Sequence, residues 1–259
     1  MTPDSPRRRA RFTRRAVVLG GAASATAAGL GALAGRDLFP RSEGDRSARP
    51  SPFVGPVGVQ LIWRLSGVGR RTALTFDDGP DPRWTPRVLE VLAAHGARAT
   101  FFMIGTHAAR HPDLVRRVAD AGHEIGNHTW SHRRIDQLDA RRLREQLDRT
   151  QATLADLTGR EPTLLRPPWG EIDAPGLLTA AQLGLRVVLW SDLVRGAHPD
   201  HDLRRLLSEV QPGAVILGHD GGPTPDDHLM STFGTLVDRL SAAGHVLTTV
   251  SAALSDPSL

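Results

Sequence analysis

The sequence LTFDDGP, residues 74–80, ends a short apolar run with two consecutive acidic residues, a glycine and a proline. The apolar run predicts a buried β-strand over residues 72–76. Asp-Gly and Gly-Pro are turn dipeptides, so Asp77 and Asp78 could serve only as turn residues. Adjacent carboxylates repel each other, however, and a bound cation or a proton-transfer reaction would explain why both stand here. The residues at the other strand ends decide between these two interpretations.

Six further strand-like runs follow, separated by amphipathic segments. The strand candidates cover residues 99–104, 123–127, 163–167, 186–190, 214–219 and 246–250, and the helical candidates cover 85–96, 139–159, 202–210 and 232–244. Alternation of this kind predicts a parallel sheet with helices outside it. About seven units predict an α/β fold, an irregular (β/α)7 barrel that forms a single domain. In such a barrel the functional groups lie at the carboxyl ends of the strands.

Ionisable side chains stand at or just after the ends of five strand candidates. They are Asp77 with Asp78, His128 with His132, Arg166, Asp192, and His219 with Asp220. Acids, histidines and an arginine that converge from distant parts of a chain are typical of an active site. A purely structural interpretation of the turns leaves this shared location unexplained.

The segment HTWSH places His128 and His132 four positions apart, so both imidazoles can face one point. A second pair with this spacing, His107 and His111, flanks an expected helix start, and there we expect solvated or capping roles. We favour the first pair because it directly follows a strand end. With one carboxylate of the Asp77–Asp78 pair it makes a three-ligand site with an open position, the pattern of a hydrolytic zinc centre. The other carboxylate would act as a base.

Four motifs occur in the order TFDDGP (75–80), GHEIGNHTWSH (122–132), RPPWG (166–170) and ILGHDG (216–221). Together they resemble the polysaccharide deacetylases of carbohydrate esterase family 4, the NodB-homology domain. The similarity extends over about residues 71–250. It implies a deacetylase-type barrel and a metal-dependent hydrolase that removes N-acetyl groups from amino-sugar polymers, such as peptidoglycan or chitin oligosaccharides, and releases acetate.

The resemblance also implies roles for single residues. Asp78, His128 and His132 correspond to the ligands of one divalent metal ion, with zinc as the default and cobalt or manganese as alternatives. Asp77 corresponds to the general base, and Arg166 is expected to orient it and keep it ionised.

The remaining roles concern the acid and the substrate. His219 corresponds to the general acid that protonates the departing amine. The backbone N–H of Trp169 is expected to stabilise the oxyanion, and Pro168 is expected to bind substrate beside it. Leu217 is expected to line the small pocket for the acetyl methyl group.

One motif departs from the family pattern. After the fifth strand the family commonly carries an Asp-Trp pair, whereas this chain has Gly196 and Ala197 at the matching places. The missing Asp normally tunes the catalytic histidine, and the missing Trp shapes the acceptor groove. Asp192 could take the place of this missing Asp, but its position in the sequence does not match that of the family residue. The substrate range is therefore left open.

The first 35 residues have the layout of an export signal, with a basic start, an apolar stretch and a small-residue end. Arg14 and Arg15 precede the apolar stretch, which resembles a twin-arginine signal. We expect cleavage after Ala34, with an uncleaved membrane anchor as the alternative. Residues 36–70 read as a linker rich in Pro, Gly, Ser and Arg that leads into a catalytic domain over 71–259. The protein is thus expected to be extracellular or associated with the cell wall.

Composition excludes several other classes of function. The chain contains no cysteine, so disulfides, thiolate metal sites and cysteine nucleophiles are excluded. The net charge is +4, but residues 1–35 carry six arginines and one acid, which leaves the remainder close to neutral. The charge therefore gives no support for a nucleic-acid partner. Three alternatives stay open: an O-acetyl xylan esterase, a hydrolase of non-sugar amides, and a non-catalytic glycan-binding relative.

Overall fold

The computed structural model describes residues 58–194 and 199–255. Its strands are β1 (Leu61–Ile62), β2 (Arg71–Asp77), β3 (Thr100–Met103), β4 (Glu124–Asn127), β5 (Leu164–Leu165), β6 (Arg186–Val188), β7 (Asp192–Leu193), β8 (Val215–His219) and β9 (Val246–Thr248). The strands pair in the order β1-β6-β5-β4-β3-β2-β8-β7, and β9 pairs with β2. Every pairing between them is parallel.

The sheet curls, and the chain passes directly from β6, next to one edge of the strand order, to β7 at the other edge. β6 pairs with β5, β7 pairs with β8, and residues 189–191 alone separate β6 from β7 along the chain. β9 fills the position beside the first half of β2, where it pairs with residues 71–73. The expected irregular (β/α)7 barrel is therefore confirmed. Its seven expected strands correspond to β2–β6, β8 and β9.

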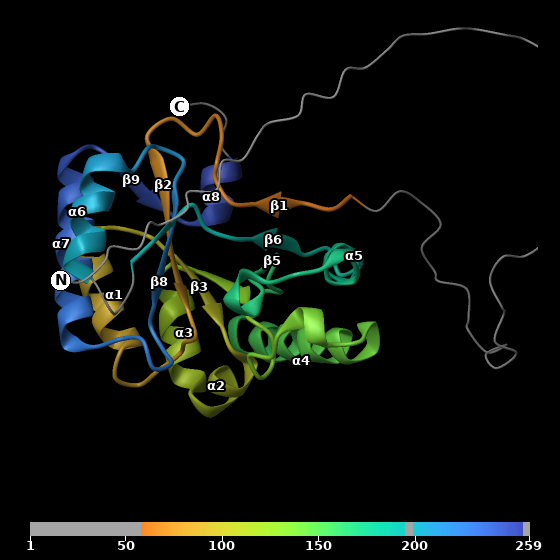
Figure 1. Ribbon diagram of the computed structural model, residues 1–259. Helices are drawn as coiled ribbons and strands as arrows, with labels where there is room; N and C mark the ends of the chain where they lie inside the picture. The colour runs from red at the N-terminus through yellow and green to blue at the C-terminus, as the bar shows by residue number, and fades with distance from the viewer. Residues whose placement is uncertain (1–57, 195–198, 256–259) are drawn as a thin grey trace, which may run out of the picture. The chain divides into compact units, whose positions relative to one another are not determined.

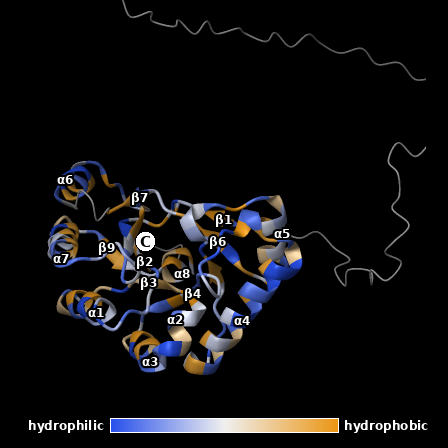
Figure 2. Ribbon diagram, turned by 60° about the horizontal axis from the view of Figure 1, so that its bottom comes forward, coloured by the Kyte–Doolittle hydropathy of each residue, from blue (hydrophilic) through white to orange (hydrophobic). Residues whose placement is uncertain are grey.

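Helices lie around the strands (Figure 1). They are α1 (Thr85–Ala94), α2 (Gly105–Arg110), α3 (Pro112–Asp120), α4 (Ala140–Thr158), α5 (Ala174–Gln182), α6 (Pro199–Glu209), α7 (Asp227–Ala242) and α8 (Val250–Ser255). Figure 2 shows hydrophobic and hydrophilic residues side by side along these helices, as expected for helices with one face on a sheet. Among the described residues, no helix combines the length and hydropathy needed to cross a membrane.

Local signals explain where the helices begin and end. Asp139 caps α4 by accepting a hydrogen bond from the backbone N–H of Arg142, and Gly159 ends this helix with a left-handed φ of 69°. Leu143, Leu147 and Leu154 are buried on one face of α4. Their spacing matches the amphipathic pattern expected for this segment, with one apolar face directed to the core.

The central strand β2 is buried along all seven residues. Phe76 stacks on Phe101 of β3, with ring centroids 5.1 Å apart, and meets Phe233 of α7 edge-on at 4.8 Å. Leu65 and Val68, which precede β2 in the expected linker region, are also buried in the core. β2 is therefore held from several sides, and Asp77 and Asp78 stand at its carboxyl end.

Candidate metal centre and active site

The carboxyl ends of β2 and β8 bring three of the expected site residues together. Asp77 is the last residue of β2 and pairs in register with His219, the last residue of β8. Asp78 follows with a left-handed φ of 72°, which turns the chain sharply at the strand end. His128 follows β4, two strands away from β2 in the sheet.

Asp78, His128 and His132 form a cluster that could hold a metal ion. Oδ1 of Asp78 lies 3.1 Å from Nε2 of His132 and 3.5 Å from Nε2 of His128. The three ligand atoms lie within 4.8 Å of one another. This carboxylate oxygen is buried and makes no hydrogen bond within the described part of the chain. One carboxylate oxygen and two imidazole nitrogens around an unsatisfied buried atom are a donor set that fits zinc.

The tautomer of His128 also suits a metal ligand. Its Nδ1 lies 2.8 Å from the backbone carbonyl oxygen of Arg166. A carbonyl oxygen can only accept, so Nδ1 carries the hydrogen and Nε2 of the neutral ring presents its lone pair toward Asp78. A backbone carbonyl on the far nitrogen is a common support for a metal-binding histidine.

The pKa values of the two histidines in the cluster shift in opposite directions. Burial alone would disfavour a charged His128, yet the nearby carboxylates of Asp77 and Asp78 more than offset this and raise its pKa. Burial likewise opposes the charge of Asp78, but the interaction with His128 lowers the pKa of this carboxyl group overall. The pKa of the more exposed His132 is lowered, first by desolvation and then by the charge of His128.

Asp77 lies beside the cluster and is bound by Arg166. Nη1 of Arg166 donates to Oδ1 of Asp77 at 2.9 Å and to Oγ1 of Thr75 at 2.7 Å. The guanidinium also donates to the backbone carbonyls of Val188 and Leu189. The side chain of Arg166 is fully buried. Asp77 keeps its other oxygen, Oδ2, 3.8 Å from Nε2 of His128.

His219 faces this group from β8. Its Nδ1 is buried without a hydrogen-bond partner among the residues that the structure describes. Asp192 does not supply one, because its carboxylate contacts Ser191, Arg205 and, at 3.9 Å, Arg64. Gly196 and Ala197, which replace the usual Asp-Trp pair, lie outside the described residues.

The expected substrate-binding residues lie near the same strand ends. Trp169 has a left-handed φ of 58°, is 56% exposed, and lies with its ring centroid 4.4 Å from that of His132. Pro168 precedes it and is buried. Leu217 is buried two residues before His219 in β8, so the pleat directs both side chains to the same face of the strand.

Two residues without an expected catalytic role contact the site. The solvated or capping role expected for His107 is wrong, because its Nδ1 lies 2.8 Å from the backbone carbonyl oxygen of Asp78. Asp220 is buried, accepts a hydrogen bond from Thr85 Oγ1 at 2.6 Å, and lies against Gly79, where a Cβ would come within 2.3 Å of its Oδ2. The glycine of the opening motif therefore makes room for this carboxyl group as well as turning the chain.

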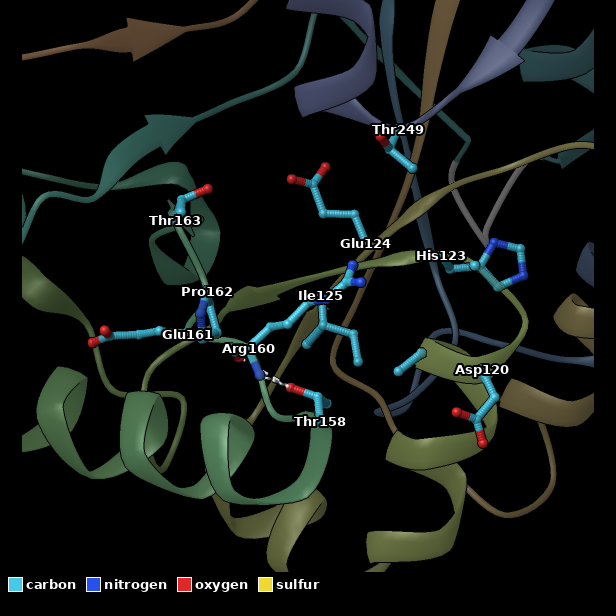
Figure 3. Close-up of a pocket in the computed structure, with 12 residues that line it drawn as sticks. Asp120, His123, Glu124, Ile125, Thr158, Arg160, Glu161, Pro162, Thr163 and Thr249 are labelled. Carbon is cyan, nitrogen blue, oxygen red and sulfur yellow. Dashed lines mark hydrogen bonds between the residues drawn. The ribbon is translucent and has the colours of Figure 1, made fainter. Parts of the chain in front are cut away.

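A separate hollow of about 550 Å³ lies at the other end of the barrel strands (Figure 3). Glu124, the first residue of β4, and Thr163, which precedes β5, line it together with Arg160. The one group of three metal-ligating side chains found among the described residues is Asp78, His128 and His132, so this hollow is not the metal centre.

Comparison with known proteins identifies the family of this site. The model of the polysaccharide deacetylase family matches residues 66–188. A peptidoglycan-N-acetylglucosamine deacetylase of Bacillus cereus is 40% identical over 167 residues, which are 63% of this chain and 60% of the relative. The chain thus spans less than two thirds of that protein. A chitooligosaccharide deacetylase of Bradyrhizobium is 38% identical over 174 residues, 66% of this chain and 79% of the relative.

A solved structure agrees with these sequence matches. A crystal structure of a peptidoglycan N-acetylglucosamine deacetylase superposes with a TM-score of 0.70 and 31% identity, over 74% of this chain and 92% of the other. The shared barrel and the matching motifs have the same explanation: this chain belongs to the polysaccharide deacetylase family.

Proposed function

We propose that this protein is an exported, metal-dependent hydrolase that removes N-acetyl groups from amino-sugar polymers and releases acetate. The main support is the cluster of Asp78, His128 and His132, of which His128 is buried, beside the buried Asp77–Arg166 ion pair. Named relatives act on peptidoglycan or on chitooligosaccharides, and either glycan class fits this chain.

Asp78, His128 and His132 are the proposed ligands of one divalent ion, with zinc as the default and cobalt or manganese as alternatives. When bound, such an ion supplies Lewis-acid activation of water and stabilises developing negative charge. The donor set of one carboxylate and two imidazoles leaves an open position, which hydrolytic zinc sites require.

The chain's own residues divide the proton transfers between them. Asp77 takes a proton from the attacking water, and the guanidinium of Arg166 orients this carboxylate through the 2.9 Å hydrogen bond. His219 gives a proton to the nitrogen as the C–N bond breaks, so that the amine can leave. Water and the acetamide are thereby converted to acetate and a free amino sugar.

Three further residues are proposed to hold the substrate. The backbone N–H of Trp169 stabilises the oxyanion that forms when water adds to the carbonyl group. Leu217 lines the pocket for the acetyl methyl group, and Pro168 shapes its wall. Trp169 also presents an exposed ring beside His132, where a sugar can lie against it.

Export of the protein rests on the sequence of residues 1–35, which lie outside the described residues. We propose that they direct the protein across the cell membrane, where peptidoglycan or environmental chitin is accessible. The catalytic domain is proposed to extend over residues 71–259, with β1 and the buried Leu65 and Val68 supporting it from the preceding segment.

Acetate release from defined substrates tests this function. The zinc-loaded protein is incubated with chitooligosaccharides, peptidoglycan and acetylxylan, and the same protein treated with a chelator is the control. We expect metal-dependent acetate release from at least one of the two N-acetylated glycans. Release from acetylxylan alone would make the protein an esterase, and release from none of them would support a non-catalytic glycan-binding protein.

A further inference from the structure

The first turn of α2 contacts both loops that carry the proposed metal ligands. The backbone N–H of Ile104 donates to the carbonyl oxygen of Gly79, next to Asp78, at 3.0 Å. The N–H of Gly105 donates to the carbonyl of Thr129 at 3.0 Å. Thr106 makes the same type of bond to Trp130, at 2.9 Å. One short segment, residues 104–106, therefore bridges the loop after β2 and the loop after β4.

Close approach of this segment depends on the absence of a side chain at Gly105. A Cβ at this position would lie 2.3 Å from a ring carbon of Trp130 and 2.7 Å from Oγ1 of Thr150. Any other residue would push α2 away from the loop that carries His128 and His132. Close packing of α2 against this loop therefore requires glycine at position 105.

Both bridged loops hold residues in an unfavourable backbone conformation. Asp78, Thr129 and His132 have φ values of 72°, 64° and 54°, in the left-handed region that residues with a Cβ rarely adopt. Such conformations persist only where the surrounding structure holds them. The hydrogen bonds from residues 104–106 are part of what holds these two loops.

His107 adds a side-chain contact to this bridge. Its Nδ1 lies 2.8 Å from the backbone carbonyl oxygen of Asp78, and since a carbonyl only accepts, Nδ1 is the donor. The bond fixes the peptide plane that follows the Cα of Asp78. The direction of the Cα–Cβ bond, and with it the position of the Asp78 carboxylate, depends on that plane.

We infer that His107 is a positioning residue for the metal centre, which it stabilises by holding Asp78 in its left-handed conformation through the Nδ1–H···O=C bond. This inference rests on the proposed function, because it takes Asp78 as a metal ligand. His107 is not itself placed among the ligands, since the cluster of the described residues consists of Asp78, His128 and His132.

Zinc titration of the full-length protein and three variants tests this role. His107→Leu removes the donor, and His107→Asn, which has nearly the same shape as Leu, places an amide N–H close to the position of Nδ1. His111→Leu is the matched control, because His111 lies four residues later between α2 and α3 and makes no side-chain cap bond. Isothermal titration of the metal-free proteins with Zn²⁺ gives each affinity without an activity assay.

We expect His107→Leu to weaken zinc binding by about 10- to 100-fold, the usual cost of losing a group that supports a metal ligand. We expect His107→Asn to recover most of this loss and His111→Leu to bind like the wild type. Wild-type affinity in His107→Leu, or equal weakening in the Leu and Asn variants, would overturn the inference.

A folding control and a replacement variant keep the test decisive if a substitution disrupts the fold. Thermal unfolding of the metal-free variants shows whether each is folded. If His107→Leu does not fold, His107→Gln replaces it in the comparison. Gln carries its amide one bond further from the backbone than Asn does, so we expect the His107→Gln protein to bind zinc more weakly than the His107→Asn protein. Zinc binding by His107→Gln that is equal to or tighter than that of His107→Asn would contradict the positioning role of His107.

Absence of zinc binding by the wild type would overturn both this inference and the proposed function. Normal zinc binding by the wild type, with variants that bind zinc equally well, would overturn this inference alone.

Discussion

Asp77 and Arg166 form a buried ion pair that joins the end of β2 to the segment after β5, with Oδ1 and Nη1 2.9 Å apart. The guanidinium is also bonded to Thr75 and to two backbone carbonyls, and it lies over the ring of Phe102 at 4.2 Å. One buried cation therefore links the proposed base to the barrel interior.

Replacement of Arg166 should destabilise the fold as well as abolish activity. Arg166→Leu leaves the carboxylate of Asp77 buried and unpaired, which we expect to lower the free energy of unfolding by about 3–5 kcal/mol. Urea denaturation of the metal-free protein measures this change. Arg141→Ala removes an exposed pair with Glu145 and should cost less than about 0.5 kcal/mol. Equal effects of the two substitutions would show that the buried pair has no special structural role.

Asp77→Asn should separate metal binding from proton transfer. The amide oxygen can still accept from Arg166, but Asn cannot take a proton from water, so we expect acetate release to fall by about 10²- to 10⁴-fold. Zinc should remain bound at one ion per chain. His128→Ala should lose both zinc and activity. Zinc at full stoichiometry in His128→Ala would contradict the ligand assignment.

Trp169→Ala should weaken substrate binding without removing the proposed oxyanion donor. The exposed ring beside His132 is lost, whereas the backbone N–H of residue 169 is retained. We expect KM to rise by about 10-fold or more, from the loss of apolar contact area, while kcat changes little. Steady-state kinetics on a chitooligosaccharide distinguish the two parameters. A fall in kcat at unchanged KM would argue against this placement of the substrate.

Asp220 should make the stability of the metal-free protein depend on pH. Burial, and to a lesser extent the charges of Asp77 and Asp78, raise the pKa of this carboxyl group from 3.8 to about 7, against the opposing hydrogen bond from Thr85. Between these two pH values the folded state holds a proton that the unfolded state has released. The free energy of unfolding therefore falls as pH rises from about 4 to 7, by an amount on the order of a few kcal/mol.

Urea denaturation at pH 5 and pH 8 tests this dependence. Asp220→Asn carries no titrating proton at this position, so its metal-free form should lose less stability between the two pH values than the wild type does. Asp156→Asn, on the exposed face of α4, is the control and should follow the wild type. The same pH slope in Asp220→Asn and the wild type would show that Asp220 does not titrate in this range.

The sequence predicted the long elements of the fold because their patterns are strong. The strand predicted at residues 72–76 lies within β2, and the amphipathic helix predicted at 139–159 contains α4, since burial requires continuous apolar or regularly spaced residues there. β1 and β7 were not predicted. Each has two residues, too few for any periodicity to appear, and their pairing depends on β6 and β8.

The sequence predicted the site residues that belong to a motif at a strand end. It did not predict His107, whose contact with Asp78 arises only when the chain is folded. His107 and His111 have the same spacing as His128 and His132, so spacing alone could not show that His107 contacts Asp78. Left-handed backbone at Asp78 or Trp169 is also invisible locally, because such residues disfavour it and the surrounding structure imposes it.

Asp78, His128 and His132 are proposed to bind one divalent ion, and the remaining roles in the site depend on this. The most direct test is a crystal structure of the zinc-loaded protein, with anomalous scattering recorded at the zinc absorption edge. We predict a single strong peak about 2.0–2.2 Å from a carboxylate oxygen of Asp78 and from Nε2 of both histidines. No peak at these residues, or a peak at other side chains while these three lie empty, would contradict the account.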